Sequence, residues 1–98
     1  MKIDWTREAW APFEHQHRYI AERSARAAEP LIDDVTHAES LIARNPEFGR
    51  PVSPRVREWG IGREKRYVLR YVVEVLVVSI IGFWHTAQMR PPLEEMEA

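Results

Sequence analysis

One histidine and three arginines in the second half of the chain are the residues best suited to acid–base chemistry. His85 follows a long apolar run, and histidine is the side chain whose charge changes near neutral pH without help. Arg63, Arg66 and Arg70 precede it and could stabilise the negative charge that develops on a phosphate in a transition state. Together these residues could cleave RNA without a metal, with His85 acting as the base or the acid.

A structural role for His85 is the simpler alternative, because a histidine at a strand end often donates only to a backbone carbonyl or a carboxylate. The other histidines do not suggest a metal site. His15, His17 and His37 lack the spacing of zinc ligands, and the chain has no cysteine. We therefore expect no metal and no cofactor.

The basic residues are concentrated between positions 50 and 70, where seven arginines and lysines face only two glutamates. The net charge of the whole chain is −1, which argues against nucleic acid as the main partner. The cluster is either a solvated face that protects a sheet edge or, because guanidinium groups pair well with carboxylates, a protein interface. We predict an interface formed by these ten residues: Arg57, Trp59, Arg63, Arg66, Arg70, Val72, Trp84, His85, Gln88 and Arg90.

Two helices are predicted in the first half of the chain. Apolar residues recur at every third or fourth position over 9–23, which is typical of one helical face. Ser24 is a suitable N-cap for a second helix, which the Asn45-Pro46 pair ends. Pro30 predicts either a kink in this second helix or a start nearer Glu29.

Alternating and apolar runs predict the strands of a sheet. A short strand over 2–6 comes first, and a weak strand over 55–61 follows the helices. Two longer strands, over 66–73 and 75–84, are separated by Glu74 as the polar turn residue. The order β-α-α-β-β-β predicts an α+β fold, in which a helical hairpin packs on one face of an antiparallel sheet.

The last strand is apolar on both faces, as expected for a central strand. Gly82 within it predicts a β-bulge or a close approach of another backbone segment. The sheet face without helices should be polar, yet alternation assigns these five apolar residues to it: Val68, Val72, Val78, Ile80 and Trp84. We expect this face to accept an apolar helix or strand of a partner.

A single domain over residues 1–91 is expected, followed by an acidic and frayed tail over 92–98. Charged residues throughout 1–20 exclude the apolar core of a secretion signal there. The longest apolar run is well short of the roughly 18 residues that a membrane-spanning helix needs. We expect a cytoplasmic protein with no membrane partner.

Five short segments carry a family resemblance. They are WTREA at the end of the first strand, YIAERSARAA between the helices, NPEFGRP after the second helix, YVLRYVV, and FWHTAQMRP at the end of the last strand. In this order and spacing they resemble the ParE/RelE superfamily of toxins from bacterial type II toxin–antitoxin systems. The resemblance covers about residues 1–91.

The resemblance implies a small toxin that a cognate antitoxin neutralises with its C-terminal segment. ParE-like members act on DNA gyrase, whereas RelE-like members are ribosome-dependent mRNA endonucleases. RelE-like nucleases typically carry several basic residues and a tyrosine just after the last strand, but no tyrosine follows Tyr71 here. We expect a ParE-like gyrase inhibitor without chemistry of its own. The alternatives are an mRNA endonuclease that uses His85 and the three arginines, and a degenerate toxin that only binds its antitoxin.

Overall fold

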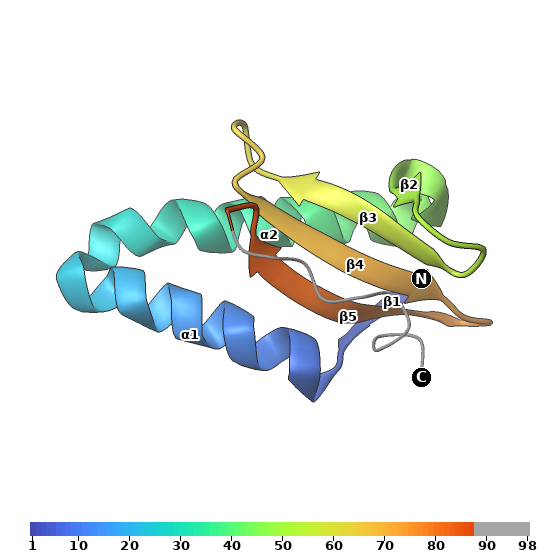
Figure 1. Cartoon of the computed structure of the whole chain (residues 1–98), viewed down its shortest axis with the longest axis horizontal. Coiled ribbons are helices and arrows are strands. Elements are labelled where there is room, and N and C mark those ends of the chain that lie inside the picture. Colours follow the sequence, from blue (N-terminus) through green and yellow to red (C-terminus); the bar gives the residue numbers. More distant parts are fainter. Residues whose placement is uncertain (88–98) are drawn as a thin grey trace.

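The computed structural model describes residues 1–87, in which a short strand leads into a helical hairpin (Figure 1). Helix α1 spans Arg7–Arg23 and helix α2 spans Ala25–Arg44. Thr6 and Ser24 are the N-caps, and each accepts a hydrogen bond from the backbone N–H three residues further on. The predicted cap at Ser24 is confirmed, whereas α1 begins earlier than predicted because Thr6 caps it.

Helix α2 runs through Pro30, so the alternative start near Glu29 is wrong. Proline removes one backbone hydrogen bond from a helix interior, and packing has to compensate for that loss. Ala28 and Leu31, on either side of Pro30, are both buried against the core. Tertiary packing therefore keeps this segment helical despite its local preference.

Five strands form one mixed sheet in the order β1-β5-β4-β3-β2. Their bounds are Lys2–Trp5 for β1, Arg50–Pro51 for β2, Val56–Ile61 for β3, Tyr67–Val73 for β4 and Val77–His85 for β5, with a short 3₁₀ helix η1 over Pro46–Phe48. The predicted α+β class and the order of the elements are confirmed, with the two-residue β2 as an addition. The sheet is antiparallel except that β1 runs parallel to β5.

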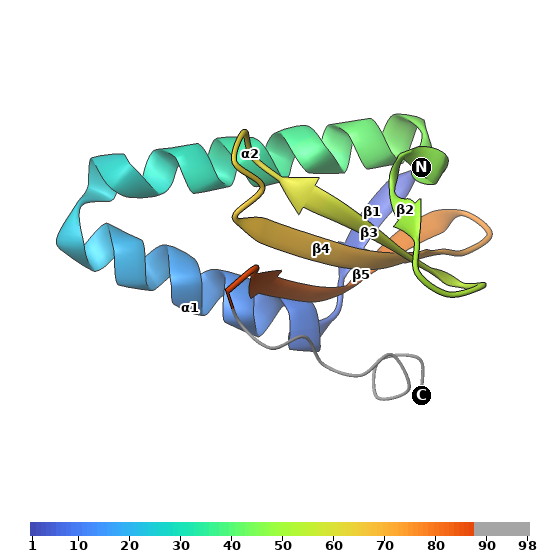
Figure 2. The same cartoon turned by 45° about the horizontal axis from the view of Figure 1, so that its top comes forward.

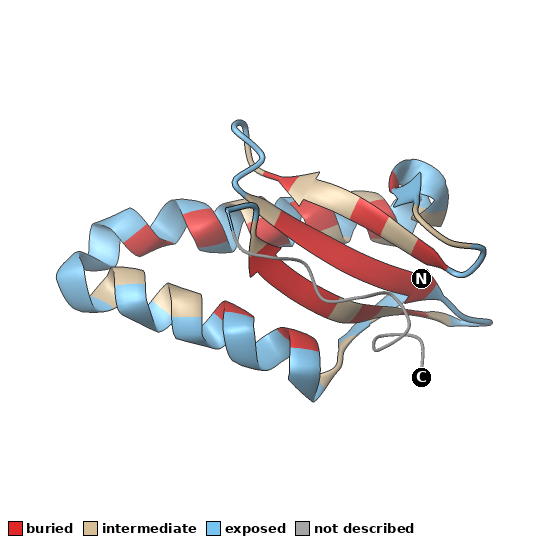
Figure 3. Cartoon of the chain, in the orientation of Figure 1, coloured by how far each residue is buried: buried red, intermediate tan, exposed pale blue. Residues whose placement is uncertain are grey.

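The core lies between the sheet and the helical hairpin. Buried residues of both helices join one apolar cluster with Leu69 and Tyr71 of β4 and with Ile80 and Phe83 of β5. Figure 3 shows β4 buried along most of its length, while the outer sides of the helices are exposed. The closed end of the hairpin projects beyond the strands in both views (Figures 1 and 2). No helix among the described residues is long and apolar enough to cross a membrane.

A β-bulge in β5 changes which face its side chains occupy. Arg70 pairs with Gly82, but the next residue, Tyr71, pairs with Ile80, so Ile81 has no counterpart on β4. The irregularity predicted at Gly82 is therefore confirmed. One extra residue reverses the in–out alternation of a strand, because side chains alternate with a period of two.

Because of the bulge, the predicted composition of the sheet face without helices is partly wrong. Val78 and Ile80 belong to the core on the helix side, where both are fully inaccessible. Val68, Val72 and Trp84 are on the opposite face, as predicted, and each is buried within the chain.

The turn between β4 and β5 is longer than the single residue predicted. The N–H of Glu74 donates to the carbonyl of Val77 at 2.8 Å, so Val75 and Leu76 are the two central residues of the turn. Strand β5 consequently begins at Val77 rather than Val75. The apolar side chains suggested a strand here, but a tight hairpin uses at least two residues to reverse direction.

Tyr71 ties the connection after α2 to the centre of the sheet. Its side chain is fully buried, and its hydroxyl donates to the carbonyl of Pro46 at 2.6 Å and accepts from the N–H of Gly49 at 2.8 Å. A Cβ atom at Gly49 would overlap the Tyr71 ring, so glycine is needed there for close approach. Burial raises the pKa of the Tyr71 hydroxyl, and the hydrogen bond from Gly49 and the charge of Arg57 only partly oppose this.

Replacing Tyr71 by phenylalanine should lower the free energy of unfolding by about 1–3 kcal/mol, because the N–H of Gly49 loses a buried acceptor. The raised pKa in the folded state also means that Tyr71 stabilises the fold fully below about pH 10 and progressively less above it. Urea denaturation at pH 7 and at rising alkaline pH would measure both effects. Tyr19→Phe, at a half-exposed position, is the control; an equal loss in both variants would contradict the assigned role of Tyr71.

Candidate partner-binding surface

The β3–β4 turn and the end of β5 bring three predicted site residues to one end of the sheet. Arg63 and Arg66 belong to the turn segment, and His85 is the last residue of β5, opposite Tyr67. The backbone N–H and the hydroxyl of Thr86 both donate to the carbonyl of Arg66, at 2.8 and 3.1 Å. These bonds hold the end of β5 beside Arg66. We call Arg63, Arg66 and His85 the basic rim.

The turn that carries Arg63 depends on glycine. Gly62 has a φ of 83°, and a Cβ atom there would also lie 2.8 Å from a carboxylate oxygen of Asp34 on α2. Both the positive φ and the close approach exclude larger residues. The glycine therefore keeps the basic rim close to the helical hairpin.

His85 is held in a fixed orientation. Its Nδ1 accepts a hydrogen bond from the N–H of Ala87 at 2.9 Å, so the neutral ring carries its proton on Nε2. The ring also packs edge-on against Tyr67, with centroids 5.2 Å apart. These contacts fix the orientation of the ring at the end of β5 and fit a structural or a binding role.

Arg70, in contrast, is buried away from the rim. Its Nε donates to Glu58 at 2.8 Å, and the two side chains are only 6% and 4% exposed. Arg50 also donates to the Glu58 carboxylate, at 3.0 Å. The Arg70 guanidinium lies over the Trp84 ring, 4.8 Å from its centroid. Arg70 is therefore not an exposed cation, and Val72 on the same face is nearly as inaccessible.

Arg57 and Trp59 lie on the helix-facing side of β3 rather than with the basic rim. Trp59 packs against Phe48, with ring centroids 5.8 Å apart. Arg57 donates to the carbonyls of Glu47 and Gly49, at 3.2 and 2.8 Å. These two residues therefore support the connection between α2 and β3.

The remaining predicted site residues, Gln88 and Arg90, lie outside the described residues, as does the predicted tail over 92–98. Within residues 1–87, no cluster of histidine and carboxylate side chains could hold a metal ion. The ten predicted partner-binding residues thus form more than one group. The basic rim is one group, and the buried Arg70, Val72 and Trp84 form another.

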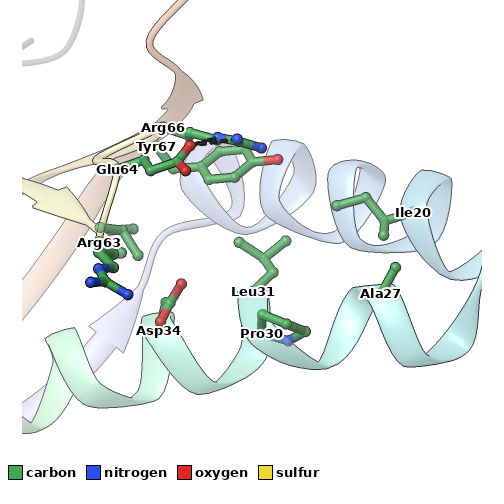
Figure 4. Close-up of a pocket in the computed structure, with 11 residues that line it drawn as sticks. Ile20, Ala27, Pro30, Leu31, Asp34, Arg63, Glu64, Arg66 and Tyr67 are labelled. Carbon is green, nitrogen blue, oxygen red and sulfur yellow. Dashed lines mark hydrogen bonds and ion pairs between the residues drawn. The ribbon is translucent and has the colours of Figure 1, made fainter.

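A cleft of about 340 Å³ lies next to the basic rim, between the helical hairpin and the β3–β4 turn (Figure 4). Its apolar lining includes Ile20 and Leu31 from the helices, whereas Arg63 and Arg66 belong to its polar lining. Asp34 also lines it and was missed in the sequence. Asp34 follows the buried Leu31 by three residues, so it lies at the border of the buried face of α2. This spacing is the one sequence signal that would have identified it.

Comparisons with known proteins give a consistent result. The family model described as "ParE toxin of type II toxin-antitoxin system, parDE" matches residues 3–90. A solved structure titled "Chromosomal ParDE TA system from P. aeruginosa" is similar with a TM-score of 0.64 and 20% sequence identity, over 87% of this chain and 95% of that chain. At this identity the structural match shows a shared fold. No curated protein sequence is significantly similar to the chain.

Glu58→Gln should lower the free energy of unfolding by about 3 kcal/mol, because it removes the negative charge from a buried ion pair. Glu64→Gln is the matched control, since Glu64 pairs with Arg66 at the surface and its loss should cost less than about 1 kcal/mol. Chemical denaturation of both variants would measure the difference. If both variants lost the same free energy of unfolding, the buried Glu58–Arg70 pair would stabilise the fold no more than a surface ion pair does.

Proposed function

Because the chain belongs to the family of ParE toxins of type II toxin–antitoxin systems, we propose that it is a binding toxin that inhibits DNA gyrase and that a cognate antitoxin holds inactive. In this proposal the chain inhibits its target by occupying it and performs no covalent chemistry. Its site of action is the cytoplasm, where gyrase and the antitoxin are found.

The engagement of Arg70 by Glu58 is the observation that carries this proposal. An RNA-cleaving site built from His85 and three arginines needs cations that a phosphate can approach. Arg70 is instead nearly inaccessible and bonded to Glu58, and Arg66 pairs with Glu64. One of the three arginines that the endonuclease alternative needs, Arg70, is therefore inaccessible and already neutralises a carboxylate of the chain itself.

The basic rim and the adjacent cleft are proposed as the antitoxin-binding surface. Arg63 and Arg66 are exposed guanidinium groups that suit an acidic segment. The apolar side of the cleft, which includes Leu31, offers a pocket for an apolar side chain of the same segment. Gln88 and Arg90 are proposed to extend this surface.

Two assays with purified toxin test the proposed target. In a gyrase supercoiling reaction we expect stabilised cleaved plasmid, and in a translating ribosome extract we expect intact message. Cut mRNA with normal supercoiling would refute gyrase as the target and favour the endonuclease alternative. No effect in either assay, together with tight antitoxin binding, would indicate a degenerate toxin.

His85→Ala separates the two mechanisms within one variant. Removing a catalytic acid or base typically lowers a rate by about 100-fold or more, so an endonuclease would lose its toxicity. A binding toxin should keep it, and growth inhibition after induced expression measures the outcome. Circular dichroism of the purified variant is the control for folding. Abolished toxicity in a folded His85→Ala protein would count against the binding mechanism.

Reversing the charge of the basic rim should weaken antitoxin binding. For Arg63→Glu/Arg66→Glu we expect the dissociation constant to rise about tenfold, with a weaker dependence on salt concentration. Arg7→Glu, on the exposed first turn of α1, is the control because it reverses one positive charge outside the basic rim, half of the change that the double variant makes. Isothermal titration calorimetry would measure all three proteins. Equal affinities for the two variants would exclude the rim from the interface.

A further inference from the structure

The tip of the β4–β5 hairpin exposes two large apolar side chains. Val75 is 92% exposed and Leu76 is 81% exposed, whereas no other large apolar residue among those described exceeds 50%. The tip projects at one end of the sheet (Figures 1 and 2). Neither side chain contributes to the core.

The turn itself does not require these residues. A two-residue hairpin turn is favoured by Asn-Gly or Asp-Gly, because the preferred turn types need a positive φ. Lys65 is the one described residue other than glycine with a positive φ, so Val75 and Leu76 form a less favoured turn. Val75 and Leu76 thus oppose the local preference of the turn, and burial of their side chains does not compensate for this. Positions of this kind are often functional.

The tip is nevertheless held in place. The Glu74 N–H donates to the Val77 carbonyl at 2.8 Å, and the Ser79 hydroxyl donates to the Glu74 carboxylate at 2.6 Å. Strands β4 and β5 are paired up to Val73. The two apolar side chains are therefore presented on an ordered support, which reduces the entropy lost on binding.

The hollow beside the tip is lined by apolar and positively charged residues, whereas the Glu74 carboxylate at the tip is bonded to Ser79. Val73, at the end of β4, is 42% exposed. It lines a hollow that also contains Val72, Arg55 and Arg57. Among residues 1–87, Arg55 makes no ion pair. A partner with an apolar pocket and an acidic rim would complement this surface.

The tip is also remote from the proposed antitoxin surface. The basic rim lies where β4 begins and β5 ends, and the tip lies where β4 ends and β5 begins. Seven residues of extended strand separate the two, a distance of roughly 20 Å. One short partner segment on the rim would leave the tip uncovered.

We propose that Val75 and Leu76 insert into an apolar, acid-rimmed pocket of the protein that the toxin inhibits. This inference rests on the proposed function, which assigns DNA gyrase as that protein. A second copy of the chain is a poorer occupant, because two side chains fall far short of the roughly 800 Å² per partner that a stable dimer buries. A protruding pair of anchors suits a concave pocket instead.

The variant Val75→Asn/Leu76→Gly tests the proposal without endangering the fold, because it installs the turn sequence that hairpins prefer. We expect an unchanged or higher melting temperature and unchanged antitoxin affinity. The concentration that half-inhibits gyrase holoenzyme should rise at least about tenfold, as expected for the loss of central anchors. Growth inhibition after induced expression should fall in parallel. Ile32→Asn, at a partly exposed apolar position of α2, is the control. This variant should inhibit gyrase and growth as strongly as the unmodified chain does.

Full growth inhibition by the folded double variant would overturn the proposal. Weakened antitoxin binding would also overturn it, because the tip would then belong to the antitoxin interface. If the unmodified chain inhibits growth but not gyrase, only the assignment of gyrase as the target is refuted. Growth inhibition by the double variant then still decides whether the tip binds the target. An unmodified chain without effect on growth or gyrase would refute both.

Discussion

The central strand β4 is the constraint on which the rest of the structure depends, because it buries side chains on both of its faces. Consecutive residues of a strand point to opposite sides, so Arg70 and Tyr71 each bring a polar group into a different buried layer. Buried polar groups need partners, and each of these finds them in another element. Glu58 of β3 neutralises Arg70, while Pro46 and Gly49 bind the Tyr71 hydroxyl. The pairing of β3 and the path of the chain after α2 both follow from these requirements.

This arrangement leaves the two proposed binding surfaces at the two ends of the sheet. The middle of the face without helices is occupied by the Arg70–Glu58 pair and the Trp84 ring, which serve the fold. At one end, the β3–β4 turn presents Arg63 and Arg66 beside an apolar cleft. At the other end, the β4–β5 turn presents exposed apolar side chains on an ordered hairpin. Under the proposed function, two separate surfaces would let an antitoxin and a target be recognised by different chemistry.

Local signals predicted the elements well. Ser24 is a helix cap by its chemistry alone, and the alternation in β4 places Leu69 and Tyr71 on one face, which the structure shows to be the helix side. The signals failed where packing or pairing opposed them. Pro30 is within α2 because its neighbours are buried, and Val75 and Leu76 are in a turn although their types favour a strand. In each case the local preference is weaker than the long-range contact or the geometry of chain reversal.

The sequence by itself determined the fold class, the order of the elements, the family and the region where basic residues gather. All of these depend on residue types and short-range periodicity, which a sequence records directly. Only the tertiary structure decided which of those residues are accessible. The bulge at Ile81 moved Val78 and Ile80 into the core, and the register between β3 and β4 placed Arg70 opposite Glu58, where both are buried. Both outcomes depend on the register between strands that are distant in sequence, and a one-residue change in register exchanges the inner and outer faces of a strand.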